Sequence, residues 1–152
     1  MFRGVNNLNL DAKGRLAVPT RYRERIADIS AGQMVVTIDT DERCLLLYPL
    51  PVWEEIERKL DALPSFNKQA RRVQRLLIGH ETEVDMDAQG RLLLPPPLRS
   101  FAGLERQAVL IGQGKKFELW DEGTWNARRE QWLDKEGDEG LEMPADLESL
   151  SL

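Results

Sequence analysis

The sequence is poor in the residues that build disulfides, zinc sites and membrane spans. It has one cysteine, Cys44, which cannot form a disulfide within one chain and fits a reducing cytoplasm. Its one histidine, His80, has no cysteine or second histidine near it, so we expect no zinc site. No apolar run approaches the roughly 20 residues of a membrane span, and the first residues lack a signal-peptide pattern.

Catalytic patterns are missing as well. There is no Ser-His-Asp set, no phosphate-cradling glycine loop and no catalytic cysteine context. Carboxylates alternate at Glu81, Glu83, Asp85 and Asp87, which could suggest an acid–base or metal site. Such a row is more typical of a solvated sheet edge. We therefore expect no enzyme, no metal and no cofactor.

One stretch occurs twice: Leu8–Pro19 returns as Val84–Pro95, with Asp, Ala, Gly, Arg, Leu and Pro in the same register. Each copy shows short alternating strands around a tight turn, which predicts a hairpin. Aspartate at the first turn position and glycine at the fourth suit a type I turn whose glycine has positive φ. The arginine after the glycine should project from the mouth of the hairpin.

The repeat continues beyond this motif, since Val35–Tyr48 matches Val109–Trp120. We expect each copy to add a short helix, a second hairpin and a helix. The first short helix should run from Thr20 to about Ile26, and the three prolines after Leu94 should shorten its counterpart. The predicted organisation is repeat one over 5–52, a helical insert over 53–79, repeat two over 80–124, and a C-terminal helix with an acidic tail over 125–152.

Charge is strongly polarised along the chain, although the net charge is −5. Residues 1–25 hold six basic and two acidic side chains, and residues 68–79 hold four basic and no acidic ones. Residues 134–152 hold seven acidic side chains and one basic. The basic segments suit contact with phosphates, whereas the tail does not. From Glu136 onward we expect a frayed or disordered tail.

The two Asp-x-x-x-Arg turns, Asp11–Arg15 and Asp87–Arg91, each followed by a proline-initiated turn, resemble the MraZ family of bacterial transcriptional regulators. The resemblance covers about residues 1–134. It implies a mainly β fold with flanking helices (α+β), a pseudo-symmetric double swapped-hairpin barrel of the AbrB/MraZ type. It further implies a sequence-specific DNA-binding repressor that binds repeated promoter boxes of the division and cell-wall gene cluster, a ring-shaped homo-oligomer, and a cytoplasmic, nucleoid-associated location.

The copies differ around their turns. The first strand of copy one carries Asn7 and Asn9 where copy two carries carboxylates, and Lys13 becomes Gln89. Copy one should therefore touch DNA, while copy two should mostly build the barrel or a subunit interface. The predicted DNA-binding residues are Arg15, Lys13, Arg3, Asn7, Asn9, Arg21, Arg25 and Arg91, and the predicted turn residues are Asp11, Gly14, Asp87 and Gly90.

Several alternatives stay open. Arg15 and Arg91 could each simply pair with the aspartate of their own turn. The basic row Lys68, Arg71, Arg72 and Arg75 could be a solvated face paired with Glu54, Glu55 or Glu57, or a second phosphate contact. Trp125 and Trp132 suit packing anchors. Two other functions are an AbrB-like antitoxin whose acidic tail caps a toxin, and an assembly scaffold without a nucleic-acid role.

Overall fold

The computed structural model of the chain describes residues 1–134 and 145–150. They divide into two compact units, Met1–Glu122 and Gly123–Leu152. Residues 135–144 and 151–152 lie outside the described residues, and the prediction of a frayed tail falls largely on them. Within that predicted tail, Ala145–Glu148 forms a four-residue helix, α6.

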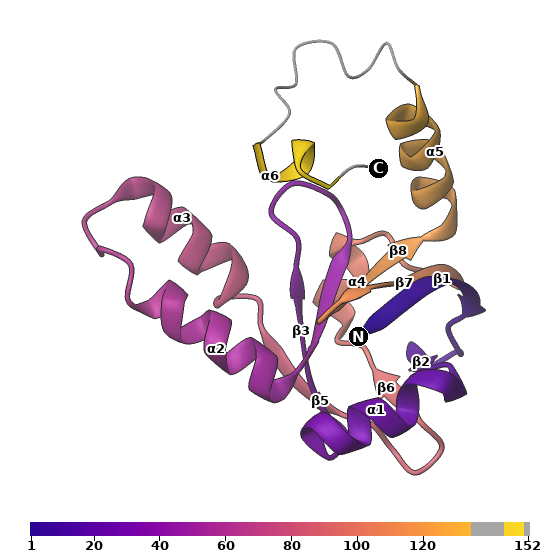
Figure 1. Ribbon diagram of the computed structural model, residues 1–152. Coiled ribbons are helices and arrows are strands. Elements are labelled where there is room, and N and C mark those ends of the chain that lie inside the picture. Colours follow the sequence, from indigo (N-terminus) through magenta and orange to yellow (C-terminus); the bar gives the residue numbers. More distant parts are fainter. Residues whose placement is uncertain (135–144, 151–152) are drawn as a thin grey trace. The chain divides into compact units, whose positions relative to one another are not determined.

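The first unit combines strands and helices, which confirms the α+β class (Figure 1). Its described strands form a six-stranded antiparallel sheet in the order β1-β7-β8-β4-β3-β5 and a separate two-stranded sheet of β2 and β6, and not one closed cylinder. The strands are β1 Phe2–Asn9, β2 Arg15–Ala17, β3 Gln33–Ile38, β4 Leu45–Pro49, β5 Thr82–Asp85, β6 Arg91–Leu93, β7 Gln107–Gly114 and β8 Phe117–Asp121. The helices are α1 Thr20–Ser30, α2 Leu50–Asp61, α3 Lys68–Leu77 and α4 Pro96–Phe101, and α5 Glu122–Leu133 begins at the unit boundary.

The prediction that the strands flanking each turn pair with each other is wrong. β1 pairs with β7, and β5 pairs with β3, while β2 and β6 pair with each other. The turns themselves form, because the backbone N–H of Asp11 donates to Arg15 O at 3.1 Å and that of Asp87 donates to Arg91 O at 2.9 Å. Each short second strand, β2 or β6, therefore pairs with the corresponding strand of the other copy. The later hairpins, β3–β4 and β7–β8, form as predicted.

Contacts between the two copies around β2 and β6 are reciprocal. The backbone N–H of Val18 donates to Gly90 O at 2.9 Å, and that of Leu94 donates to Gly14 O at 3.1 Å. Gly14 and Gly90 have φ of 81° and 77°, as the turn chemistry predicts. A Cβ on either glycine would collide with the guanidinium of an arginine from the other copy's helix. The positive φ of the turn therefore favours glycine at both positions, and the missing side chain also leaves room for the two arginines.

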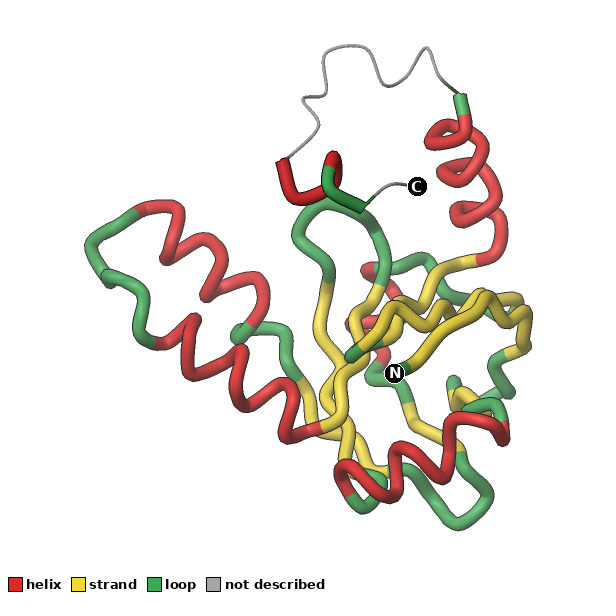
Figure 2. Tube along the Cα trace, in the orientation of Figure 1, coloured by secondary structure: helices red, strands yellow, loops and turns green. Residues whose placement is uncertain are grey.

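The main sheet is buried on both faces where β3 and β4 run. Val36 and Leu47 face the core that also holds the β2–β6 pair. Val35 and Tyr48 face the other way and pack with Trp53 of α2. This explains why these strands appear in the sequence as continuous apolar runs. Figure 2 shows α2 and α3 as neighbouring red helices, and a hydrogen bond from Gln74 Nε2 to Leu60 O at 2.8 Å joins them.

Helix ends follow local sequence signals, with one correction. α1 extends to Ser30, beyond the predicted end near Ile26, and Ser30 Oγ donates to Ile26 O at 3.0 Å. Ala31, at φ 54°, ends the helix in a left-handed conformation, and its backbone N–H donates to Ala27 O. Asn67 caps α3 by accepting two backbone N–H bonds. The six-residue α4 is shorter than α1, as its prolines predict.

Nearly all of α5 lies in the second unit, and it forms the C-terminal helix that the sequence predicts. The rings of Trp125 and Trp132 lie 5.8 Å apart at 64°, in an edge-on arrangement. The two tryptophans therefore pack on each other, in keeping with the anchoring role predicted for them. Arg128 lies over the Trp132 ring, with its guanidinium carbon 5.0 Å from the ring centre.

The β2–β6 pair generates a stability prediction. Leu92 faces Leu16, and both are 0% exposed, whereas the adjacent Leu93 is 55% exposed. Leu92→Ala should lower the free energy of unfolding by about 2–5 kcal/mol, because it leaves a cavity at the junction of the copies. Leu93→Ala should change it by less than about 0.5 kcal/mol. Urea denaturation of both variants measures the difference. Similar losses of the free energy of unfolding would show that packing at the β2–β6 pair does not stabilise the fold more than an exposed leucine does.

Candidate nucleic-acid interface

The first turn is organised by the carboxylate of Asp11. Its Oδ1 accepts the backbone N–H groups of Lys13 and Arg15, each at 2.9 Å. Its Oδ2 accepts Arg15 Nε at 2.6 Å. These bonds, first among them the one from the Arg15 backbone, lower the pKa of the Asp11 carboxyl to about 2. The carboxylate is therefore ionised at neutral pH and fixes both the turn and the arginine.

The pairing of Arg15 with its own aspartate, one of the two sequence interpretations, is thus present. It engages Nε and leaves the two terminal nitrogens of the guanidinium without a hydrogen-bond partner among the described residues. The Arg15 side chain is 27% exposed. A guanidinium held by Nε can offer both terminal N–H groups to one acceptor pair, such as the edge of guanine or a phosphate.

The second turn repeats this geometry with one difference. Asp87 accepts the backbone N–H groups of Gln89 and Arg91 at 3.0 and 2.8 Å, and Arg91 Nε at 2.8 Å. The pKa of Asp87 is lowered for the same reason, first by the Arg91 backbone bond. Here, however, Arg91 Nη2 also donates to Gln89 Oε1 at 3.3 Å. One terminal nitrogen of Arg91 is therefore already engaged, in a turn where copy one has Lys13.

Lys13 does not stand apart from the acidic strand, although the sequence pattern predicts that it should. It lines a hollow of about 510 Å³ together with Glu83 and Asp85 of β5. The reason is the exchange of the short strands, which carries the first turn to the second copy. The contrast between amides near one turn and carboxylates near the other is therefore weaker in space than in sequence.

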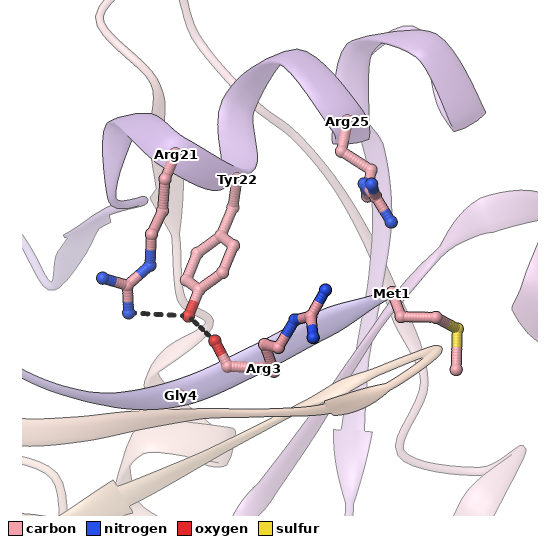
Figure 3. Close-up of a pocket in the computed structure, with 6 residues that line it drawn as sticks. All are labelled: Met1, Arg3, Gly4, Arg21, Tyr22 and Arg25. Atoms are coloured by element: carbon pink, nitrogen blue, oxygen red, sulfur yellow. Dashed lines mark hydrogen bonds between the residues drawn. The ribbon is translucent and has the colours of Figure 1, made fainter.

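The other residues predicted to contact DNA lie in two separate places. Asn7 and Asn9 are exposed on β1, an edge strand of the main sheet that leads into the first turn. Arg3, Arg21 and Arg25 come together in a separate hollow between β1 and α1 (Figure 3). Asn9 lies six residue steps along the extended strand from Arg3, or about 20 Å. The structure thus does not gather all the predicted residues at the Arg15 turn.

The basic row of α3 is exposed. Lys68, Arg71, Arg72 and Arg75 lie on its solvent side. Within residues 1–134, no ion pair within 4 Å joins this row to Glu54, Glu55 or Glu57 of α2. The interpretation as a solvated face therefore holds without the expected salt bridges, and a phosphate contact stays a prediction.

Sequence reasoning missed a cluster at the start of the acidic row. Trp53 Nε1 donates to Glu57 Oε2 at 3.1 Å and also to Glu81 Oε2. Partial burial, followed by the neighbouring Glu57 carboxyl, raises the pKa of Glu81 to about 7. Glu83 and Asp85 are exposed as a solvated edge requires, but Glu81 is not part of that edge. The one signal in the sequence was the spacing that puts Glu57 on the Trp53 face of α2.

The described residues offer neither a membrane span nor a metal site. No described helix has the length and apolar character needed to cross a lipid bilayer. Among residues 1–134 and 145–150, no three histidine, cysteine, aspartate or glutamate side chains gather closely enough to hold a metal ion.

Comparison with known proteins gives a consistent result. The chain matches the MraZ protein family, which its description relates to antitoxins, over residues 1–76 and 77–139, so each match contains one turn. It is similar to transcriptional regulator MraZ of Halorhodospira halophila and of Thioalkalivibrio sulfidiphilus, with 59% identity to each over 152 residues. Identity to the protein of the same name from Coxiella burnetii is 57% over 152 residues. In all three, 100% of both chains is covered.

The Glu81 cluster predicts a pH-dependent stability. Because the pKa of Glu81 is higher in the folded chain than its ordinary 4.5, the folded state binds more protons between pH 4.5 and about 7. The free energy of unfolding should therefore fall as pH rises through this window, by on the order of 1–3 kcal/mol. Glu81→Gln should flatten this dependence and raise stability at pH 8.

Thermal melts at pH 5 and pH 8 test this prediction. Glu83→Gln, at an exposed position on the same strand, serves as the control and should melt with the wild-type pH dependence. Equal pH dependence in wild type and Glu81→Gln would show that the cluster does not titrate in this range.

Proposed function

The chain belongs to the MraZ family of transcriptional regulators, and we propose that it acts by binding DNA sequence-specifically through its first turn. The observation that carries the proposal is the state of Arg15. Asp11 holds its Nε, and its two terminal nitrogens have no hydrogen-bond partner among the described residues. This arrangement suits bidentate recognition of guanine in the major groove, the commonest specific contact of arginine.

The neighbours of Arg15 take supporting roles in this proposal. Lys13 adds a cation at the tip of the turn, and Asn7 and Asn9 offer amides along β1. Arg21 and the other arginines of the α1 hollow add attraction for phosphates, which positions the protein without reading sequence. Arg91 contributes less, because Gln89 already occupies one of its terminal nitrogens.

A single turn is too small for tight binding, since specific protein–DNA interfaces bury at least about 1,000 Å² of protein surface. We infer that several chains assemble in a ring and engage repeated boxes, so that each contact gains from effective concentration. Both edges of the main sheet, β1 and β5, are unpaired on their outer side within the described chain. Val5 and Leu93 expose more than half of their surface. These features favour self-association.

The finer architecture and role complete the proposal. The reciprocal contacts of the two turns support a pseudo-symmetric swapped-hairpin barrel. The target would be repeated promoter boxes of the division and cell-wall gene cluster, with repression as the outcome, in the cytoplasm at the nucleoid. An antitoxin role fits the family description, but the acidic segment expected to cap a toxin lies largely outside the described residues. The described geometry supports DNA binding better.

The two turns can be compared directly. Arg15→Ala should abolish binding to a box-containing duplex, because each guanidinium contact with a base is worth roughly 1–3 kcal/mol and the loss repeats in every subunit. Arg91→Ala should weaken binding much less. Gel shifts at two salt concentrations measure both effects, and a sizing column checks that assembly is retained. Equal losses with intact assembly would mean that both turns read DNA.

Assembly gives a second test of the proposal. One chain has a mass of 17.4 kDa, and light scattering at micromolar concentration should return a mass larger than twice this value. A mass of a single chain under these conditions would rule out recognition by a preassembled ring.

A further inference from the structure

A hollow of about 450 Å³ opens between the start of β1 and helix α1. It is lined by Met1, Arg3, Gly4, Arg21, Tyr22 and Arg25, which include three arginines and no acidic residue. Figure 3 shows that the side chain of Arg3 rises from the strand while that of Arg25 descends from the helix into the same gap. The side chains therefore converge from two different elements.

The cationic groups of this hollow lack internal compensation. None of the three arginines forms an ion pair within 4 Å among residues 1–134. All three are exposed, so their charge is available to a ligand. Guanidinium groups that share one hollow repel one another, and an anion between them would relieve this repulsion.

Tyr22 gives the hollow a fixed wall. The buried ring of Tyr22 packs edge-on against Phe2 and Phe117, with ring centres 5.9 and 5.0 Å away. Its hydroxyl donates to Arg3 O at 2.6 Å and accepts Arg21 Nη2 at 2.9 Å. Arg21 also donates to Asn6 Oδ1. One arginine of the three is thus held in place before any ligand arrives.

We propose that this hollow is a binding pocket for a phosphate or diphosphate group, separate from the Arg15 turn. Arginine matches phosphate oxygens with paired N–H donors, and a hollow with three such side chains suits a charged, compact group better than an extended groove would. The proposal refines the phosphate contact suggested above for these arginines, but it holds even if the chain does not read DNA. The phosphate is supplied either by a DNA backbone or by a free phosphorylated compound.

Inorganic pyrophosphate is the direct probe of this pocket. Isothermal titration of the full-length chain at low ionic strength should show saturable binding with one site per chain, because surface charges are least screened there. Arg25→Gln and, separately, Arg3→Gln should each weaken this binding about tenfold or more. Two variants are used because each removes one guanidinium from a different element. Circular dichroism confirms that both remain folded.

A control variant tests whether pyrophosphate binds in this pocket or at basic side chains elsewhere on the chain. Arg58→Gln removes the same charge from an exposed position on α2 and should bind pyrophosphate as the wild type does. Absence of saturable binding to the wild type would overturn the proposal. So would full binding by both pocket variants, or an equal loss in the Arg58→Gln control.

Competition identifies the source of the phosphate. A duplex without promoter boxes is titrated into the pyrophosphate-bound protein, with a nucleoside triphosphate in a parallel experiment. Displacement by the duplex supports a backbone phosphate as the natural occupant. Displacement by the nucleotide alone supports a free phosphorylated ligand. Displacement by neither would overturn the proposal, since the pocket would then not accept a phosphate joined to a larger molecule.

Discussion

The pairing of two three-residue strands, β2 and β6, holds the first unit together. Leu16 and Leu92 meet at its centre, both fully buried, and the hydrogen bonds at either end join the turn of one copy to the strand of the other. Short strands pair weakly by themselves. Their stability therefore depends on the core above them and on the arginines, Arg23 and Arg99, whose Nε groups donate to Val18 O and Leu94 O.

The pairing of β2 with β6 also determines which side chains lie near each turn. In sequence, the first turn belongs with the amides of β1 and the second with the carboxylates of β5. In space, Lys13 shares a hollow with Glu83 and Asp85. An electrostatic argument based on neighbours in sequence therefore loses much of its force. The difference between the turns lies instead in one hydrogen bond, from Arg91 Nη2 to Gln89, which copy one has no means to form because lysine cannot accept it.

The sequence was a good guide wherever a structure is fixed by neighbouring residues. The turn glycines, the aspartate-centred turns and the proline-shortened α4 all follow from local chemistry. It was a poor guide to partners distant in the chain. A short strand such as Arg15–Ala17 carries too little pattern to specify whether it pairs within its own turn or with the other copy. The Glu57–Glu81 cluster was missed for the same reason, since its members come from an insert helix and a strand entrance.

The position of Arg15 reflects a compromise between affinity and order. Pairing with Asp11 offsets part of its positive charge, which weakens its long-range attraction for phosphates. The same pairing already restricts the rotamers of the Arg15 side chain. The entropy cost of ordering this side chain on binding is therefore smaller. A contact with a base edge benefits from a fixed side chain, whereas attraction for phosphates benefits from uncompensated positive charge. The fixed arginine of the turn therefore suits the proposed base contact. The proposed phosphate pocket suits the arginines of the α1 hollow, which form no ion pair within residues 1–134.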